Sequence, residues 1–146
     1  MAAGPQVGPV LNLRRTLEAT PARVFKAWTD PNEVKLWFGP GDYTTPQVEI
    51  DLRVGGRYRF GMKPPQGDIF YLSGEFRVIE PPKRLVYTWA WEGENQEQET
   101  LVTVDFVDRG GKTEVVMRQE HFANAEECAK HEQGWILTLD KLPRLL

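Results

Sequence analysis

The chain of 146 residues has few side chains suited to holding a transition metal: one cysteine, Cys128, and two histidines, His121 and His131. A single thiol excludes both an internal disulfide and a cysteine-rich zinc site. Neither histidine belongs to a paired motif such as HExxH, in which two imidazoles share one helix face. We therefore expect no metal and no other cofactor.

Long basic runs and long apolar runs are also missing. The longest basic run is Arg14-Arg15, and the aromatic residues do not alternate with Lys or Arg, so no nucleic-acid partner is expected. An apolar fraction of 40%, a charged fraction of 27% and a net charge of −3 are typical of a soluble globular protein. No apolar run is long enough to suggest a membrane span.

A chain of this length is expected to form a single domain, which we place at residues 10–146. Residues 1–9 are rich in Ala, Gly and Pro and have no basic segment followed by an apolar one. They resemble a flexible leader rather than a secretion signal. We accordingly expect a cytoplasmic protein that is either a monomer or a weak homodimer paired through an exposed sheet edge.

Residues 124–146 are predicted to form one long helix of about 30 Å. Asn124 can cap its first turn. Residues at steps of three or four lie on one side of this helix and form a mostly apolar stripe. They are Cys128, His131 or Glu132, Trp135, Leu139 and Leu142. Gly134 inside this helix costs about 1 kcal/mol relative to Ala. Its presence predicts that a strand or a ligand approaches the helix backbone closely at this point.

The rest of the chain is predicted to form one strand, two short helices and six further strands. Thr20-Pro21 and Asp30-Pro31 are helix-start signals, because the first residue can cap and proline is tolerated at the first helical position. The strands are expected at residues 10–17, 45–52, 57–62, 69–80, 84–91, 98–107 and 112–122. The fold class is therefore α+β, with a curved antiparallel sheet of six or seven strands wrapped around the C-terminal helix.

The sequence has more large aromatic residues than one small core is expected to need. Alternation along the strand at 84–91 places Tyr87, Trp89 and Trp91 on one face, which could line a pocket of about 300 to 1,000 Å³. Each ring taken singly is more typical of a core residue than of a ligand contact. The candidate cavity residues are Trp28, Trp37, Phe38, Phe60, Tyr87, Trp89, Met117, His121, Trp135 and Leu139.

Catalytic motifs are weak. Ser73 is the only serine and has no nucleophile turn around it, and a lone Cys128 beside His131 is more typical of a buried small hydrophobe than of a thiolate–imidazole pair. General acid or base catalysis needs only a polar group in an apolar cavity. The candidates for that role are Glu49, Asp51, Glu75, Arg77, Gln119 and, strongest because it precedes the final helix, His121. An enzyme is thus less expected than a binding protein.

Four segments resemble bacterial single-domain members of the family named after the activator of the 90-kilodalton heat-shock-protein ATPase, in the START-like helix-grip superfamily. They are VFKAWTDPNEVKLWFGPGDY, VEIDLRVGGRYRFGM, GEFRVIEPPKRLVYTW and HEQGWILTLDKL. The family signals within them are TDP with WFGP, DLRVGG, and the HxxGW pattern of His131, Gly134 and Trp135. Phe38 departs from the pattern, since many relatives have a second Trp after Trp37, and this would alter the shape of a pocket.

The resemblance implies a helix-grip fold with a cavity between sheet and helix, and three possible functions. Relatives in the superfamily bind lipids, sterols and polyketides, some cyclise or dehydrate polyketides, and the eukaryotic namesake regulates a chaperone. Our first hypothesis is binding of a small, mostly apolar or aromatic molecule in that cavity. The alternatives are a chaperone-linked regulator, which would have a chaperone partner, and a cyclase-like or hydrolytic enzyme that uses a cavity histidine or carboxylate.

Overall fold

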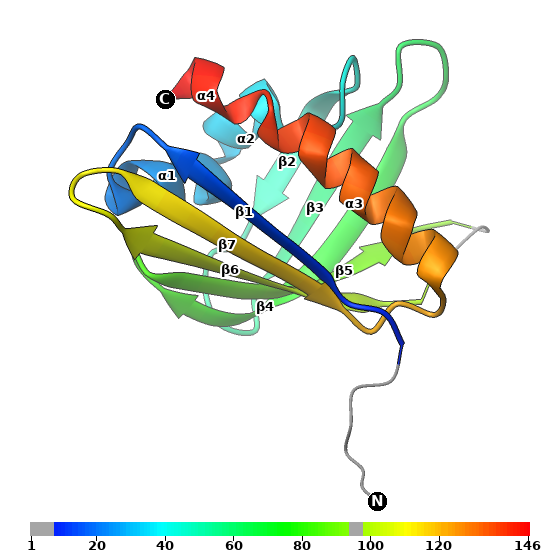
Figure 1. Cartoon of the computed structure of the whole chain (residues 1–146). Coiled ribbons are helices and arrows are strands. Elements are labelled where there is room, and N and C mark those ends of the chain that lie inside the picture. Colours follow the sequence, from blue (N-terminus) through cyan, green and yellow to red (C-terminus); the bar gives the residue numbers. More distant parts are fainter. Residues whose placement is uncertain (1–7, 94–97) are drawn as a thin grey trace, which may run out of the picture.

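A single seven-stranded antiparallel sheet curves around the C-terminal helix, and two short helices follow the first strand (Figure 1). The computed structural model describes residues 8–93 and 98–146, so the expected leader lies almost entirely outside the described residues. The predicted α+β helix-grip architecture is confirmed. Within the described part of the chain, no helix has the length and hydropathy needed to cross a bilayer.

The strands follow the order β1-β7-β6-β5-β4-β3-β2, so that β2 to β7 form a meander and β1 pairs with β7. This arrangement makes β1 and β2 the edge strands. The elements are β1 Leu11–Leu17, α1 Pro21–Thr29, α2 Pro31–Trp37, β2 Thr44–Ile50, β3 Arg57–Lys63, β4 Phe70–Glu80, β5 Arg84–Trp91, β6 Thr100–Asp108, β7 Thr113–Glu120, α3 Ala125–Leu139 and α4 Leu142–Leu145.

Both short helices begin where the capping signals predicted. The Thr20 hydroxyl accepts a hydrogen bond from the backbone N–H of Arg23, and the Asp30 carboxylate accepts one from the second residue of α2. The Arg23 guanidinium then pairs with Glu33 at 2.6 Å and donates to the carbonyl of Leu145. One side chain of α1 is thereby bonded to α2 and to the end of α4.

Strands β3, β4 and β5 approach one another closely at Gly74. A Cβ atom at this position would lie 1.9 Å from the backbone oxygen of Thr88, and the Tyr58 ring packs over the same spot. The Tyr58 hydroxyl donates to that Thr88 oxygen at 2.6 Å, and the pairing of β4 with β5 shifts register between Phe76 and Val78. Such an irregularity bends a strand and increases its twist, which helps the sheet to curve around α3.

The C-terminal segment differs from the single long helix that was predicted. Helix α3 ends at Leu139, and α4 begins only at Leu142, so α3 is about 22 Å long. The physical reason is Pro143, whose ring would clash with the carbonyl of Leu139 and which has no N–H to donate to it. The alternative left open for the apolar stripe is also resolved, because His131 faces the core and Glu132 faces solvent.

Replacing Gly74 with Ala should lower the free energy of unfolding by about 1 to 3 kcal/mol, because the new methyl group would have to displace the backbone of β5. Urea denaturation followed by tryptophan fluorescence measures the change. Gly134→Ala makes the same exchange in α3, where an added Cβ atom meets no described atom within 4 Å, so it serves as the control and should not lower stability. Equal midpoints for the two variants would contradict a close approach of β5 at Gly74.

Candidate ligand-binding cavity

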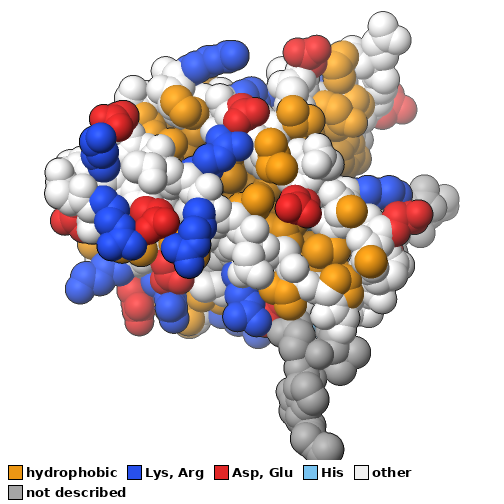
Figure 2. Space-filling model, in the orientation of Figure 1, with side chains coloured by type: hydrophobic (Ala, Val, Ile, Leu, Met, Phe, Trp, Pro, Cys, Tyr) orange, Lys and Arg blue, Asp and Glu red, His pale blue; other side chains and the backbone are white. Residues whose placement is uncertain are grey.

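A cavity of about 300 Å³ lies between α3 and the sheet. Its lining comes from the loop after α2, from β3, β4 and β5, and from one side of α3. The lining residues are Phe38, Pro40, Tyr43, Met62, Phe70, Trp89, Trp91, Lys130, His131, Gly134, Trp135 and Thr138. In the space-filling view the surface is hollowed between the β3–β4 hairpin and the first turns of α3, with hydrophobic side chains visible around the hollow (Figure 2).

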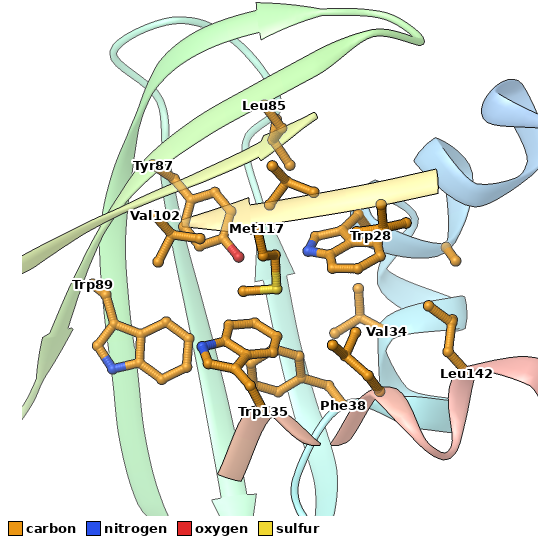
Figure 3. Close-up of a cluster of buried hydrophobic side chains, with 14 of the residues drawn as sticks. Trp28, Val34, Phe38, Leu85, Tyr87, Trp89, Val102, Met117, Trp135 and Leu142 are labelled. Carbon is orange, nitrogen blue, oxygen red and sulfur yellow. The ribbon is translucent and has the colours of Figure 1, made fainter. Parts of the chain in front are cut away.

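Three buried rings form the inner wall of this cavity. Trp89 of β5 lies 5.5 Å from Trp135 of α3, and Phe38 lies 6.0 Å from Trp89 and 5.9 Å from Trp135, measured between ring centroids. The close-up shows the three side chains converging from β5, from α3 and from the loop after α2 (Figure 3). Phe38 packs edge to face on Trp135, and the other two pairs are tilted, so each ring is held by its two neighbours.

The other side of this wall is core. A void of only about 20 Å³ lies there, lined by Phe38 again and by Trp28, Val34, Trp37, Tyr58, Phe60, Phe76, Leu85 and Tyr87. That volume accommodates roughly one water molecule and no organic ligand. Burial raises the pKa of the Tyr87 phenol, which therefore stays neutral. Phe38 thus separates a packed interior from a cavity that can accept a molecule.

A buried polar relay fixes the ring of Trp135. Its indole N–H donates to Oε1 of Gln119 at 2.9 Å, and Nε2 of Gln119 donates to the Thr100 hydroxyl at 2.8 Å. Gln119 is fully buried, so both bonds form in a region of low dielectric, where they strengthen and where a lost partner would be costly. The relay connects β6, β7 and α3 and holds one indole edge in place.

The polar groups of the lining lie mainly on α3. Lys130 is exposed at the rim, whereas the His131 imidazole is 9% exposed and lies 5.5 Å from Trp89 and 5.0 Å from Phe122. The Thr138 hydroxyl donates to a backbone carbonyl one helical turn earlier. None of the twelve lining residues carries a carboxylate. The α3 side of the cavity is therefore neutral to basic, and the strand side is apolar.

Gly134 has free space where a side chain would start. A Cβ atom built there meets no atom of residues 8–93 or 98–146 within 4 Å, although the residue lies in the middle of α3 and borders the cavity. The predicted close approach of a strand is therefore wrong, and the alternative reason for the glycine, a ligand, stays a prediction. Alanine would fit the helix better by about 1 kcal/mol. Packing within the protein gives no reason for the glycine.

Lys141 holds the loop that forms the opposite rim. Its ammonium group donates to the backbone oxygens of Gly41 at 3.1 Å and Tyr43 at 3.2 Å. Burial and the nearby Arg144 lower the pKa of Lys141. Pro40 and Tyr43, which line the cavity, are thereby held near the end of α3.

Comparison with known proteins now decides the family. Residues 18–146 match the family described as Activator of Hsp90 ATPase homolog 1-like protein, which is most of the chain. The protein belongs to this family. The resemblance seen in the sequence motifs is confirmed, as is the START-like helix-grip fold that it implied.

Solved structures of bacterial proteins superpose closely on this family member. A Chromobacterium violaceum protein aligns with a TM-score of 0.86 at 25% identity, covering 93% of this chain and 95% of its own. A family protein from Silicibacter pomeroyi gives 0.82 at 24% identity, covering 93% and 96%. The human activator of 90 kDa heat shock protein ATPase homolog 1 is 23% identical over 86% of this chain. The chain spans about a third, 33%, of that relative's length.

The structure brings together only some of the ten residues predicted for the cavity. Those that line it are Phe38, Trp89 and Trp135. Those that line the small void behind it are Trp28, Trp37, Phe60 and Tyr87. Met117 and Leu139 are buried in the core and line neither space. Proximity to α3 therefore did not separate wall residues from core residues, because both groups are aromatic or aliphatic and both are buried.

His121 lies outside the cavity. Its side chain is exposed, and its backbone adopts a φ of 77°, a left-handed conformation that ends β7 before the turn into α3. The side chain of Gln98 donates to its carbonyl oxygen. None of the strand carboxylates weighed as a general base lines the cavity, and the histidine that does is His131.

Several lining residues were not among the predicted ones: Pro40, Tyr43, Met62, Phe70, Trp91, Lys130, His131, Gly134 and Thr138. Two signals for them were present in the sequence. Alternation placed Trp91 in the same row as Trp89, and Gly134 was out of place in a helix. No pattern pointed to the loop residues Pro40 and Tyr43, because loops carry no periodicity that assigns a face.

Replacing Gln119 with Leu should cost about 1 to 3 kcal/mol of stability, because the indole N–H of Trp135 would be left buried without an acceptor. Urea denaturation measures this, and a change in tryptophan emission of the folded variant would report the altered surroundings of the ring. Gln133→Leu makes the same exchange at an exposed position of α3 and should be nearly neutral. If both variants unfold at the same urea concentration, the relay does not hold Trp135.

Proposed function

We propose that this family member binds a small, mostly apolar or aromatic molecule in the cavity between α3 and the sheet. The observation that carries the proposal is Gly134. A glycine in mid-helix lowers stability, yet among the described residues a Cβ atom there would meet no atom within 4 Å, and the position borders the cavity. A ligand that occupies this space would explain why the position has no side chain.

The size and walls of the cavity limit what that molecule is. A volume of about 300 Å³ is at the lower end of the range for ligand sites and equals the liquid volume of roughly ten waters. The occupant would thus have roughly 10 to 20 non-hydrogen atoms. The walls of Phe38, Trp89 and Trp135 favour a planar molecule, because flat rings pack on one another with few voids.

Replacing Gly134 with Leu should abolish binding of a neutral apolar probe, N-phenyl-1-naphthylamine, because the new side chain would occupy the cavity. Fluorescence titration of the probe measures its affinity for the wild type and the variant. Gln133→Leu, the matched control on the solvent side of α3, should bind the probe as the wild type does. Binding that survives in Gly134→Leu would place the probe elsewhere and contradict the proposal.

Gly134→Ala provides a second control that does not depend on a large side chain. It should raise the free energy of unfolding by up to about 1 kcal/mol while it weakens probe binding, because the methyl group favours the helix and narrows the cavity. A loss of stability in this variant would mean that the glycine has a structural role within the protein, and the space beside it would then need no ligand to explain it.

A second candidate function is regulation of a chaperone ATPase, supported by family membership and by the similarity to the human activator. It would use the outer surface, where Leu36, Val54 and Leu137 are exposed. In this case the protein should raise ATP hydrolysis by a purified 90-kilodalton heat-shock protein, and Gly134→Leu should act like the wild type. An unchanged ATPase rate with excess protein would count against this function. A cytoplasmic location, inferred from composition, suits both candidates.

A further inference from the structure

The polar groups around the cavity are distributed unevenly, and this bears on the occupant's charge. Among the described residues that line the cavity, Lys130 and His131 are the two with basic side chains, both on α3, and none carries a carboxylate. Glu126, Glu127 and Glu132 also belong to α3, but none of them borders the cavity. A cationic occupant would therefore meet a basic rim without a carboxylate in the lining to neutralise it.

The rings of β4 and β5 border the basic residues of α3: His131 packs on Trp89 and Trp91, with ring centroids 5.5 Å and 6.2 Å away, and Lys130 lies at the exposed rim. Phe70, Trp89 and Trp91 come from β4 and β5, and their centroids lie 5.3 to 5.4 Å apart along the row, so they form a continuous ring surface. Lys130 and His131 come from the first half of α3. An occupant packed against the rings would thus have one edge directed to the basic side.

The ring surface also contains a hydrogen-bond donor. Among the described residues, the indole N–H of Trp89 has no hydrogen-bond partner, and only 6% of the residue's surface is exposed. A buried donor without an acceptor is unfavourable. Because the nitrogen atom is itself buried, an occupant of the open cavity would not reach it, and this donor does not distinguish an acid from an amine.

We propose that the occupant is a planar aromatic or apolar acid whose ring lies on the rings of β4 and β5 and whose carboxylate points to Lys130. This proposal rests on the proposed binding function and specifies its ligand class. Aromatic rings alone also attract cations through their π faces, so an aromatic amine is the competing occupant. The charge of Lys130 at the rim and the absence of a carboxylate from the described lining favour the acid.

Three probes of one shape test the charge preference: 2-naphthoate, its neutral isostere 2-naphthamide, and the cation 2-naphthylmethylammonium. Their affinities are measured at pH 7.5 by displacement of N-phenyl-1-naphthylamine and by calorimetry. Naphthoate should bind about three- to tenfold tighter than naphthamide, and the ammonium probe weakest. The advantage of naphthoate should shrink as sodium chloride is added, because Lys130 is exposed and its charge is screened.

Substitution of Lys130 tests the effect of its charge on binding separately from the effect of the cavity's shape. Lys130→Met should remove most of the preference for naphthoate while it leaves the affinity for naphthamide within about twofold of wild type. Lys83→Met, an exposed lysine in the turn before β5 that does not line this cavity, should change neither affinity. Equal affinities for the three probes, or tightest binding of the ammonium probe, would overturn the proposal.

The failure of this inference can be told apart from failure of the binding function. If N-phenyl-1-naphthylamine binds the wild type and Gly134→Leu excludes it, but naphthoate has no advantage over naphthamide, the cavity binds ligands without selecting acids. If neither the neutral probe nor any naphthalene derivative binds, the cavity does not accept aromatic molecules of this size, and both proposals fall.

Discussion

The packing of Trp135 on Trp89 and Phe38 is the contact on which the cavity depends. It brings together α3, β5 and the loop after α2 at centroid distances of 5.5 to 6.0 Å. Gln119 holds the indole nitrogen of Trp135 from β7. Since burial of a large ring is among the strongest favourable contributions that one side chain makes, α3 has a defined position on the sheet. The space beside it is therefore a fixed feature of the fold.

Core and cavity share one wall, and their physical requirements differ on its two sides. Behind Phe38 the rings leave a void of about 20 Å³, so the interior is packed closely, as stability demands. In front of it about 300 Å³ is open, and apart from Trp135 the residues that border it on α3 are small or polar. Gly134 and Lys130 contribute little to the core. Changes at these positions can therefore alter the cavity while the fold remains.

The sequence predicted the architecture well and the cavity only in part. Helix caps at Thr20 and Asp30 and the period-two strands are local signals, because the hydrogen bonds and side-chain alternation that produce them involve neighbouring residues. The length of the last helix was overestimated although Pro143 was a local signal that should have ended it. His121 was expected at the mouth of the cavity, but the left-handed turn at this residue leaves its side chain on the surface.

By itself, the sequence determined the order of elements, the α+β class, the family and the apolar side of α3, since each follows from spacing along the chain. Only the tertiary structure decided which aromatic residues are core and which are wall. That distinction depends on the close approach of β5 to Gly74 and on the position of Trp135 beside Gln119, and both contacts join residues far apart in sequence. The same long-range packing leaves the space beside Gly134 open and places Lys130 and His131 at its edge, which no local pattern encodes.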